Sequence, residues 1–300
     1  MNYIDIGNNT KIITNNDSDE IAYTDNDLKI NVKGKNNIIY IEQPNKFHDC
    51  TINFYGDNNV IFIGKQSKHD YNFNIEIRNN QYVYLGGETY FNGKLNMILS
   101  EHQGIIIGKD CLFSYGCTIR TADPHLIYDI KSKKRTNYSK SVIIGDHVWV
   151  GQGCLILKDT KIGSGSIVAG GTVGKLVCNS NSIIGGNPGK EFKKGVVWDG
   201  KSVHAWKENN TEKNGTVKIE MLERNTYKTN YTFQDLNKID NDLKKYLKQT
   251  NEDCYGLIEA MKEFHEKSDK NRLAVCNEIK ERNNKIKGLG LLLKRIICKK

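Results

Sequence analysis

One histidine of the chain stands in a context suited to proton transfer. His125 lies in the string TADPHLIYD, residues 121–129, two positions after Asp123. The pKa of an unperturbed histidine lies near neutral pH, so its imidazole can take a proton from an alcohol while the alcohol oxygen attacks a carbonyl. Asp123 is placed to orient this imidazole, and Tyr128 or Asp129 are alternatives. We therefore predict that His125 is a general base, a corner residue without chemistry being the alternative.

The other histidines and the cysteines lack such a context. His147 sits in the middle of a six-residue repeat and is predicted to face solvent. The remaining histidines are predicted to lie at the surface: His48, His69, His102, His204 and His265. The eight cysteines form no CxxC pair, and no group of histidines and cysteines has the spacing of metal ligands, so we expect no metal site. Three cysteines are expected inside the fold rather than as nucleophiles: Cys111, Cys117 and Cys154.

Two further features could line a binding path. Trp149 closes the hexapeptide 144–149, where a large aromatic side chain is expected to point outward and to line a substrate path, or to pack against another subunit. The segment Ala169-Gly-Gly offers bare backbone N–H groups, which suit the amides of a ligand or a developing oxyanion.

Internal repeats predict the elements that position these residues. Ile41, Ile63, Leu85 and Ile107 fall 22 residues apart, and each ends an apolar run that follows a polar cluster. Self-similarity at a fixed period is typical of a solenoid, in which each unit buries its apolar face against its neighbours.

The middle of the chain repeats every six residues. The apolar positions of this repeat are Ile107, Phe113, Ile119, Ile144, Val150, Ile156, Ile162 and Val168. The position that follows Ile119 is His125, so this histidine is predicted to stand where an inward apolar residue would otherwise be buried. Six residues per face and three faces per coil give a triangular prism with 18 residues per turn, and the 22-residue period adds a corner loop. Glycines follow several of these positions, where a tight corner leaves little room for a side chain: Gly108, Gly145, Gly151 and Gly163. We predict an all-β solenoid, a left-handed parallel β-helix, with a right-handed β-helix as the alternative for residues 34–107.

The breaks in the pattern predict the domain organisation. Residues 1–33 are a lead-in, 34–190 form the β-helix domain, and 191–300 form a mainly helical C-terminal module. The repeat fails over 126–141, which predicts an extended active-site loop, because long loops in compact repeat arrays are often functional. The β-helix is expected to end near 185–189. Beyond it we expect a strand within 216–222 and helices over 241–249, 253–266 and 269–286.

Charge is concentrated at the C-terminal end. The net charge is +9, and residues 201–300 hold 22 Lys and Arg against 15 Asp and Glu. Residues 285–300 hold six basic side chains and no acid. Such a tail suits an acidic glycan, an anionic membrane or nucleic acid, or simply aids solubility. Because no apolar run is long enough to span a membrane and the N-terminus lacks the pattern of a signal peptide, we expect a cytoplasmic protein.

Residues 107–190 resemble the hexapeptide-repeat acetyltransferases. The resemblance rests on TADPHLIYD at 121–129, RTN at 135–137, IGDHVWVG at 144–151 and IGSGSIVAGG at 162–171, and these motifs are similar to those of the sugar O-acetyltransferase branch. The string DPHLIYD, with a tryptophan 24 residues after its histidine, is most similar to capsular polysaccharide and polysialic acid (sialate) O-acetyltransferases. The sequence departs from the family where Gly174 and Lys175 replace Thr-Lys and where Tyr138 replaces a common proline.

The resemblance implies an activity and its site. It implies acetyl-CoA as co-substrate, without a metal, and direct transfer without an acyl-enzyme. His125, Asp123 and Trp149 would be catalytic, and Trp149 would also line the acetyl and pantetheine path. The implied cofactor groove is lined by Gly151, Ala169, Gly174 and Lys175, with Lys190 at the coenzyme A phosphates. The family further implies a homotrimer, in which neighbouring prisms close three equivalent sites.

The last expectations concern the acceptor and the partners. We expect a glycan acceptor that is anionic, sialic acid being a candidate, no nucleic acid, and peripheral contact of the basic C-terminus with the inner face of the membrane. One alternative keeps the fold but acetylates an amino group of a nucleotide-linked sugar. Another is a solenoid scaffold without enzymatic activity, because a fold alone does not fix a function.

Overall fold

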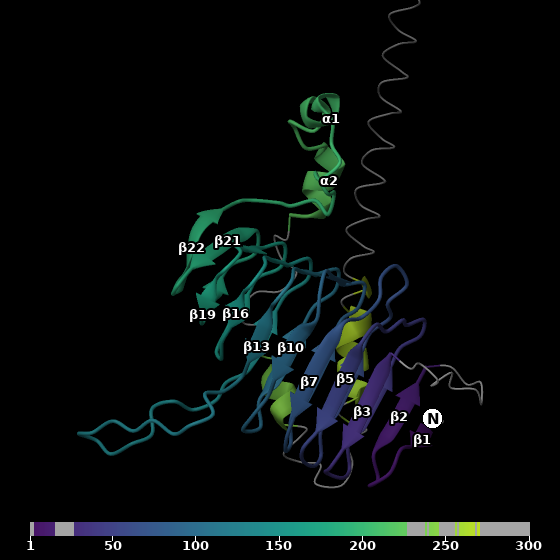
Figure 1. Ribbon diagram of the computed structural model, residues 1–300, viewed down its shortest axis with the longest axis vertical. Helices are drawn as coiled ribbons and strands as arrows, with labels where there is room; N and C mark the ends of the chain where they lie inside the picture. The colour runs from purple at the N-terminus through teal and green to yellow at the C-terminus, as the bar shows by residue number, and fades with distance from the viewer. Residues whose placement is uncertain are drawn as a thin grey trace, which may run out of the picture.

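The computed structural model describes residues 3–15, 27–226, 238, 240–245, 256, 258–267 and 269–270. Its body is a parallel β-helix whose coils stack along one axis (Figure 1). Three sheets form its faces, and we name them A, B and C. Sheet A contains nine strands: β1 (Tyr3–Asp5), β2 (Lys11–Thr14), β4 (Ile38–Ile41), β6 (Val60–Ile63), β8 (Tyr82–Leu85), β11 (Gly104–Ile107), β14 (Val142–Ile144), β17 (Lys161–Ile162) and β20 (Val177–Cys178).

The other two faces are built in the same way. Sheet B contains seven strands: β3 (Leu28–Val32), β5 (Cys50–Phe54), β7 (Phe73–Ile77), β10 (Leu95–Ile98), β13 (Thr118–Arg120), β16 (Leu155–Ile156) and β19 (Val173–Gly174). Sheet C contains six strands: β9 (Tyr90–Phe91), β12 (Leu112–Phe113), β15 (Trp149–Val150), β18 (Ile167–Val168), β21 (Ser182–Gly186) and β22 (Gly189–Lys194). The prediction of a triangular prism is confirmed.

All coils wind with the same hand. The chain runs from sheet A to sheet C to sheet B and back to A, as in β11, β12, β13 and β14, and successive coils stack in one direction. In the earlier coils a parallel bridge between Phe47 and Tyr71 stands where sheet C continues. Because neither the order of the faces nor the stacking direction changes, the 22-residue coils and the later coils form one left-handed β-helix. A right-handed segment over 34–107 is therefore excluded.

The predicted repeat positions point inward and form ladders. Ile63, Leu85, Ile107 and Ile144 are register partners in sheet A, and each is buried. On sheet C the rings of Phe91 and Phe113 stack with centroids 5.9 Å apart and planes 12° apart. Burial of each such side chain stabilises the fold by about 1.5–3 kcal/mol, so the ladders hold the prism together.

Glycines at the corners allow the coils to approach closely. A Cβ atom on Gly145 would lie 2.6 Å from Ser164 Oγ, and one on Gly151 would lie 2.5 Å from Gly170 N. Any side chain at either position would push the next coil away. The prediction of tight corners after the inward positions is therefore confirmed for these two glycines.

The β-helix begins before residue 34. Strand β2 pairs in parallel with β4, and β3 pairs in parallel with β5, so both belong to the stacked sheets rather than to a separate lead-in. At the other end β21 forms the last parallel pair, with β18, and then folds into an antiparallel hairpin with β22. This end falls where the sequence predicted it, at 185–189.

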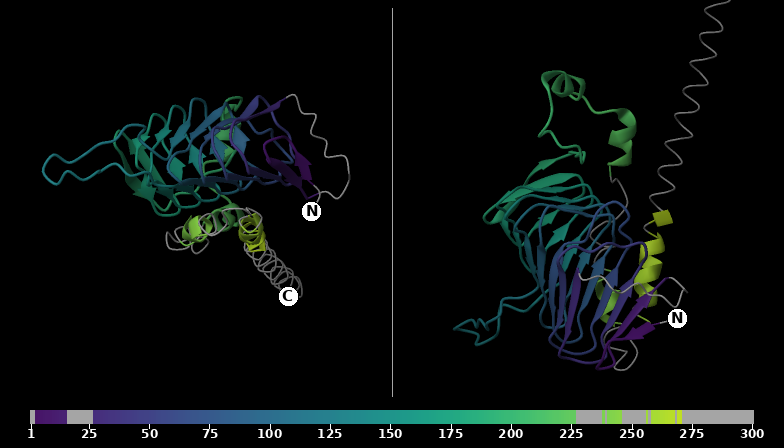
Figure 2. Two further views of the ribbon diagram at one scale, coloured as in Figure 1. Left: turned by 90° about the horizontal axis from the view of Figure 1, so that it is seen from below. Right: turned by 45° about the vertical axis from the view of Figure 1, so that its right-hand side comes forward.

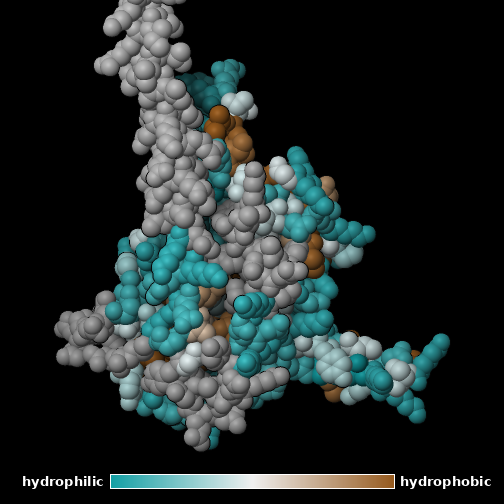
Figure 3. Space-filling view, turned by 180° about the vertical axis from the view of Figure 1, so that it is seen from behind, coloured by the Kyte–Doolittle hydropathy of each residue, from teal (hydrophilic) through white to brown (hydrophobic). Residues whose placement is uncertain are grey.

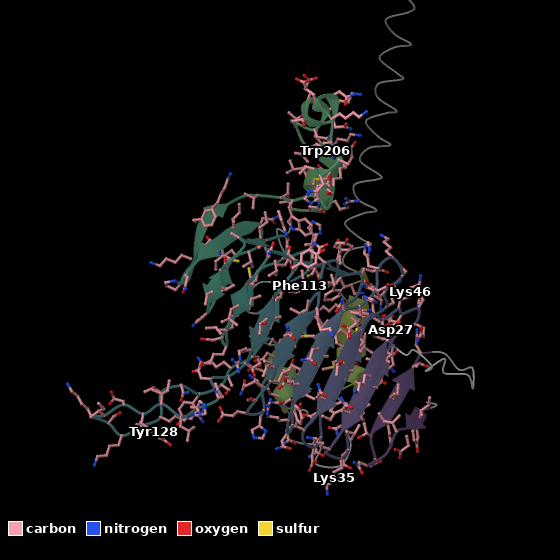
Figure 4. The ribbon with its side chains drawn as sticks, in the orientation of Figure 1. Asp27, Lys35, Lys46, Phe113, Tyr128 and Trp206 are labelled. Atoms are coloured by element: carbon pink, nitrogen blue, oxygen red, sulfur yellow. The ribbon has the colours of Figure 1, made fainter. Side chains whose placement is uncertain are left out.

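An arm projects from one corner of the prism. The chain leaves sheet B after β13 and returns at β14, and the residues between them extend far beyond the body (Figure 1). A bridge between Tyr128 and Arg135 holds its two strands together, and Tyr128 lies out along the arm (Figure 4). The prediction of a loop thrown out over 126–141 is confirmed.

The C-terminal module is helical where the structure describes it. It contains α1 (Glu208–Lys213) and α2 (Ile219–Arg224), with Trp206 just before α1 (Figure 4), and further helical residues at 240–245 and 258–267. The prediction of a strand within 216–222 is wrong, because the helix α2 begins at Ile219. The predicted helices over 241–249 and 253–266 are observed in part. The helix over 269–286 and the basic tail lie almost wholly outside the described residues.

The helical residues 240–245 and 258–267 cover the outer face of sheet A (Figure 2). This face is apolar, with Tyr40, Phe62 and Tyr84 stacked along it, and Ile258 and Met261 pack against it. The apolar outer face of sheet A is therefore buried within the chain itself.

Polar side chains anchor these helices to sheet A. His265 is buried, its Nδ1 lies 2.8 Å from the Tyr84 hydroxyl, and its Nε2 lies 2.8 Å from Glu42 Oε2. Asp240 accepts a hydrogen bond from the Tyr82 hydroxyl. The prediction that His265 lies at the surface is therefore wrong, because the sequence does not reveal that a helix covers this sheet. Among the described residues, no helix is long and apolar enough to cross a membrane.

Candidate active site

His125 lies at the base of the arm and is exposed to solvent. It therefore does not occupy an inward position of the ladder, because the chain has already left the coil. Its carbonyl oxygen accepts a hydrogen bond of 2.6 Å from the Nδ2 of Asn137, a buried side chain on the returning strand. The Asn137 Oδ1 accepts from the Ile127 N–H at 2.9 Å. One amide thus holds both strands of the arm and fixes the backbone of His125.

A charged cluster braces the arm against the body. Arg135 donates two hydrogen bonds to the Glu101 carboxylate, at 2.5 and 2.8 Å, and Ser139 binds the same carboxylate. These bonds, the one from Arg135 foremost, lower the pKa of Glu101 to about 2. The arm therefore leaves the body in a defined direction.

Asp123 does not orient the His125 ring in this chain. Its Oδ2 accepts a hydrogen bond of 2.5 Å from Lys158 Nζ and lies 3.4 Å from Asn137 Nδ2. The bond from Lys158 holds the pKa of Asp123 below its usual value. The alternative Asp129 instead accepts from the Ser132 N–H at 2.7 Å, within the arm. Among the described residues, none forms a hydrogen bond with the imidazole of His125.

Trp149 lies on a different side of the prism. It is the first residue of β15 on sheet C, and its side chain points outward, with 39% of the residue exposed. The arm that carries His125 springs from the corner between sheets B and A, and in a triangular prism that corner lies opposite sheet C. The structure therefore does not bring His125 and Trp149 of one chain together.

His147 is buried rather than exposed, which corrects the prediction from sequence. Its Nδ1 lies 3.1 Å from Asp110 Oδ2 and its Nε2 lies 3.2 Å from the Trp198 carbonyl oxygen. Both partners are acceptors, so both contacts are hydrogen bonds only when the ring is protonated. Its backbone φ of 52° places it at a corner, where the side chain turns back against the body.

Trp198 is a residue that sequence reasoning missed. It is buried, stacks on the His147 ring with centroids 4.0 Å apart, and donates from Nε1 to the His147 carbonyl oxygen at 2.8 Å. Its ring also lies 6.1 Å from that of Trp149. No repeat or motif includes Trp198, so only its type, a large aromatic just after the β-helix, hinted at a role.

Two of the predicted cofactor residues stack at the corner between sheets C and B. Gly151 ends the β15 segment, and Ala169 occupies the same corner one coil later. The N–H groups of Ala169 and Gly171 donate to Ile184 and Gln152 carbonyl oxygens, so they are not bare as expected. Gly170, which is exposed, keeps a backbone N–H that donates to no described residue. This is the amide that a ligand can use.

The other predicted cofactor residues are distributed toward the C-terminal end. Gly174 has a φ of 135° and lies near Pro188. The Lys175 ammonium pairs with Asp159 at 2.5 Å, while Lys190 is exposed on β22. Gly174 and Lys175 lie at the corner between sheets B and A, away from Gly151, so these residues do not line one groove within a single chain.

The remaining sequence predictions concern thiols and metals. Cys117 and Cys154 are buried inside the prism, where their thiols donate to the carbonyl oxygens of Gly151 and Ala169, both at 3.3 Å. Cys111 is buried as well, so the prediction that these three lie inside is confirmed. Within the described part of the chain, no group of three or more His, Cys, Asp or Glu side chains could hold a metal ion.

One segment of the β-helix matches a known protein family. Residues 141–173 match the family model described as bacterial transferase hexapeptide (six repeats). The chain carries a hexapeptide-repeat transferase segment. That segment contains Trp149, Gly151 and Ala169, whereas His125 on the arm lies outside it.

Curated relatives extend the similarity. The chain is 33% identical over 89 residues to the polysialic acid O-acetyltransferase of Escherichia coli O1:K1 / APEC, which is 30% of this chain and 29% of that protein. It is 48% identical over 50 residues to the polysialic acid O-acetyltransferase of Neisseria meningitidis, which is 17% of this chain and 23% of that protein. The matched segments thus span less than a third of the length of these relatives.

Solved structures match over a longer stretch than the sequences do. The polysialic acid O-acetyltransferase OatWY superposes with a TM-score of 0.54 and 28% identity, covering 69% of this chain and 95% of that one. The polySia-specific acetyltransferase NeuO gives a TM-score of 0.53 and 25% identity, covering 69% and 98%. The hexapeptide segment therefore sits within a whole fold that is similar to these enzymes.

Proposed function

We propose that this protein is an O-acetyltransferase, which moves an acetyl group from acetyl-CoA to a hydroxyl of an acidic cell-surface glycan, with polysialic acid as the candidate acceptor. The observation that supports it most is the likeness to OatWY, 28% identical over 95% of that chain. We assign the chemistry to His125 on the arm and to Trp149 on sheet C. We place the reaction in the cytoplasm, with peripheral membrane contact through the basic residues 285–300.

In this proposal His125 performs direct transfer. Its imidazole takes the proton of the sugar hydroxyl while the oxygen attacks the thioester carbonyl of acetyl-CoA. The tetrahedral intermediate then collapses, the C–S bond breaks, and the imidazolium returns its proton to the coenzyme A thiolate. The free N–H of Gly170 is suited to hydrogen-bond the cofactor or the oxyanion, and the exposed Trp149 indole to pack against the acetyl and pantetheine groups.

We further propose that the site is shared between subunits of a homotrimer. His125 and Trp149 of one chain lie on opposite sides of the prism, so they can act together only if the arm of one chain reaches sheet C of another. The arm carries exposed apolar side chains among hydrophilic ones (Figure 3), which suits a subunit contact: Leu126, Ile127, Tyr128, Ile130 and Tyr138. Sheet A is covered by the chain's own helices, which leaves sheets B and C for the neighbours.

Complementation between two inactive variants tests this arrangement. We would co-express His125→Ala and Trp149→Ala chains and measure coenzyme A release with polysialic acid. In a mixed trimer, an intact site forms where His125 comes from one variant and Trp149 from the other. Random mixing gives this pairing at about one quarter of the sites. Mixing His125→Ala with the double variant is the control and should restore nothing.

Three results would contradict the proposal. No restored activity in the first mixture, with trimers present, would overturn the shared site. Acetylation of an amino group on a nucleotide-linked sugar, with none on sugar hydroxyls, would favour the N-acetyltransferase alternative. If no acceptor releases coenzyme A, the scaffold alternative gains support instead.

A further inference from the structure

A second group of polar and aromatic side chains lies on the face that carries Trp149, nearer the N-terminal end of the β-helix. Tyr90, Leu112 and Trp149 are register neighbours across β9, β12 and β15, so they form one outward stripe on sheet C. Because neighbouring strands lie about 4.8 Å apart, Tyr90 is about 10 Å from Trp149 along the stripe. The ring of His69 extends it, with its centroid 4.7 Å from that of Tyr90 in an edge-to-face contact.

A cavity of about 310 Å³ opens beside Tyr90. Its size is at the lower end of the range for small-molecule sites, which suits a single sugar ring. Polar side chains line it: His48, Lys68, His69, Asp70 and Asn72. Tyr90 is 41% exposed and offers a flat ring at the edge of the cavity. The cavity therefore combines an aromatic surface with several hydrogen-bonding groups.

The hydrogen-bond donors of this cavity can bind an anion, although the formal charges of Lys68 and Asp70 cancel. Lys68 and the two imidazoles can donate hydrogen bonds to a carboxylate, while Asp70 is the one acid in the lining. Lys68 forms no ion pair with any residue in the described part of the chain, so its ammonium is available to a ligand. By contrast, the nearby Lys94 is already paired with Asp49 at 2.6 Å.

We propose that this cavity is a remote acceptor subsite, which binds one acidic sugar residue of a polymeric glycan while another residue of the same polymer reacts beside Trp149. The carboxylate of that sugar is bound by Lys68 and His69, and the apolar side of its ring packs on Tyr90. The proposal rests on the proposed function, since it assumes an acidic glycan as acceptor. It explains how the enzyme could prefer a polymer to a single sugar, because only a chain can span both positions.

The test separates binding at the subsite from catalysis. We would titrate the full-length protein, without acetyl-CoA, with sialic acid oligomers of increasing length, and in parallel measure acetyl transfer to monomer and polymer. The variant is Lys68→Ala with His69→Ala. The matched control is Lys29→Ala, an exposed lysine on sheet B that removes one positive charge outside the lining of the cavity. A neutral glucose oligomer is the ligand control.

The double variant should weaken binding of the longer oligomers and raise the KM for the polymer about tenfold, the effect of losing a charge-assisted hydrogen bond. The KM for acetyl-CoA and the kcat at saturating polymer should stay unchanged, as should all parameters of Lys29→Ala. Equal oligomer affinity in the double variant and Lys29→Ala would overturn the subsite, as would equal binding of the neutral oligomer. If the wild-type protein binds acidic oligomers at the cavity but never releases coenzyme A, the proposed function fails while the subsite stands.

Discussion

His125, on the arm, and His147, at a corner of the prism, should respond to substitution in opposite ways. His125 is exposed, and the one hydrogen bond that fixes its position involves its backbone carbonyl. His125→Ala should therefore leave the melting temperature unchanged and lower kcat by about 100- to 10,000-fold, the usual effect of removing a general base.

His147 should show the reverse pattern. Its ring is buried, contacts Asp110 and the Trp198 carbonyl, and stacks on the Trp198 indole at 4.0 Å. The substitution His147→Asn is the appropriate change, because asparagine tolerates the positive φ of this position better than alanine does. Losing the contacts of the ring with Asp110 and the Trp198 carbonyl, together with the aromatic stack, costs about 3 kcal/mol of stability. For a chain of 300 residues that lowers the melting temperature by about 5 °C.

Thermal unfolding and steady-state kinetics of the two purified variants distinguish a catalytic role from a structural one. The kinetics are measured at 25 °C, well below both melting temperatures, so that a loss of stability is not mistaken for a loss of chemistry. His147→Asn should keep most of its kcat. A near-normal kcat in His125→Ala together with its loss in His147→Asn would refute the assignment, and the base would then have to be sought at the corner of Asp110 and His147.

Three further predictions concern other parts of the chain. Trp149→Ala should raise the Kd for acetyl-CoA as well as lower kcat, measured by calorimetry and kinetics, whereas His125→Ala should leave that Kd unchanged. Burial alone would raise the pKa of Glu42, but its contact with His265 lowers this pKa below the ordinary value of 4.5. The contact should therefore stabilise the fold above pH 4.5, and this stabilisation should be lost as the pH falls through the lowered pKa. The melting temperature of Glu42→Gln should consequently approach that of the wild type in acid, and a constant difference between pH 7 and pH 3 would contradict this. Deleting residues 287–300 should raise the KM for polysialic acid at low salt, and less so at high salt, because screening acts within about 10 Å at 0.1 M; an unchanged KM at low salt would leave only a role in solubility.

The β-helix could be predicted from sequence because its inward-facing apolar residues recur once per coil. Ile63, Leu85 and Ile107 stand one coil apart in both the sequence and the register of sheet A. The start of the β-helix was harder to place, because β2 and β3 precede the first complete polar-apolar repeat and join the sheets only through their pairing with β4 and β5.

The site was only partly predictable because its contacts join segments far apart in the chain. The exposure of His147 was predicted from its place within a hexapeptide, yet the positive φ at that corner and the arrival of Trp198, 51 residues later, bury it. The pairing of Asp123 with Lys158 likewise depends on two coils meeting at one corner. A periodic pattern identifies which residues face inward, but it does not show which segment covers an outward residue.

The geometry also explains how the residues that bind the acceptor can change in such a fold while the residues proposed to react stay in place. On sheet C each added coil extends the outward stripe by one strand spacing, so Tyr90 and Trp149 stay aligned however many coils lie between them. Residues that bind a distant part of a polymer can therefore change in the early coils while the arm, the corner amides and Trp149 remain fixed by the later ones. Trp198 connects the C-terminal module to this fixed part, since it packs between His147 and Trp149. The module is thus bound to the solenoid at sheet A and also at Trp198, whose ring lies 6.1 Å from that of Trp149.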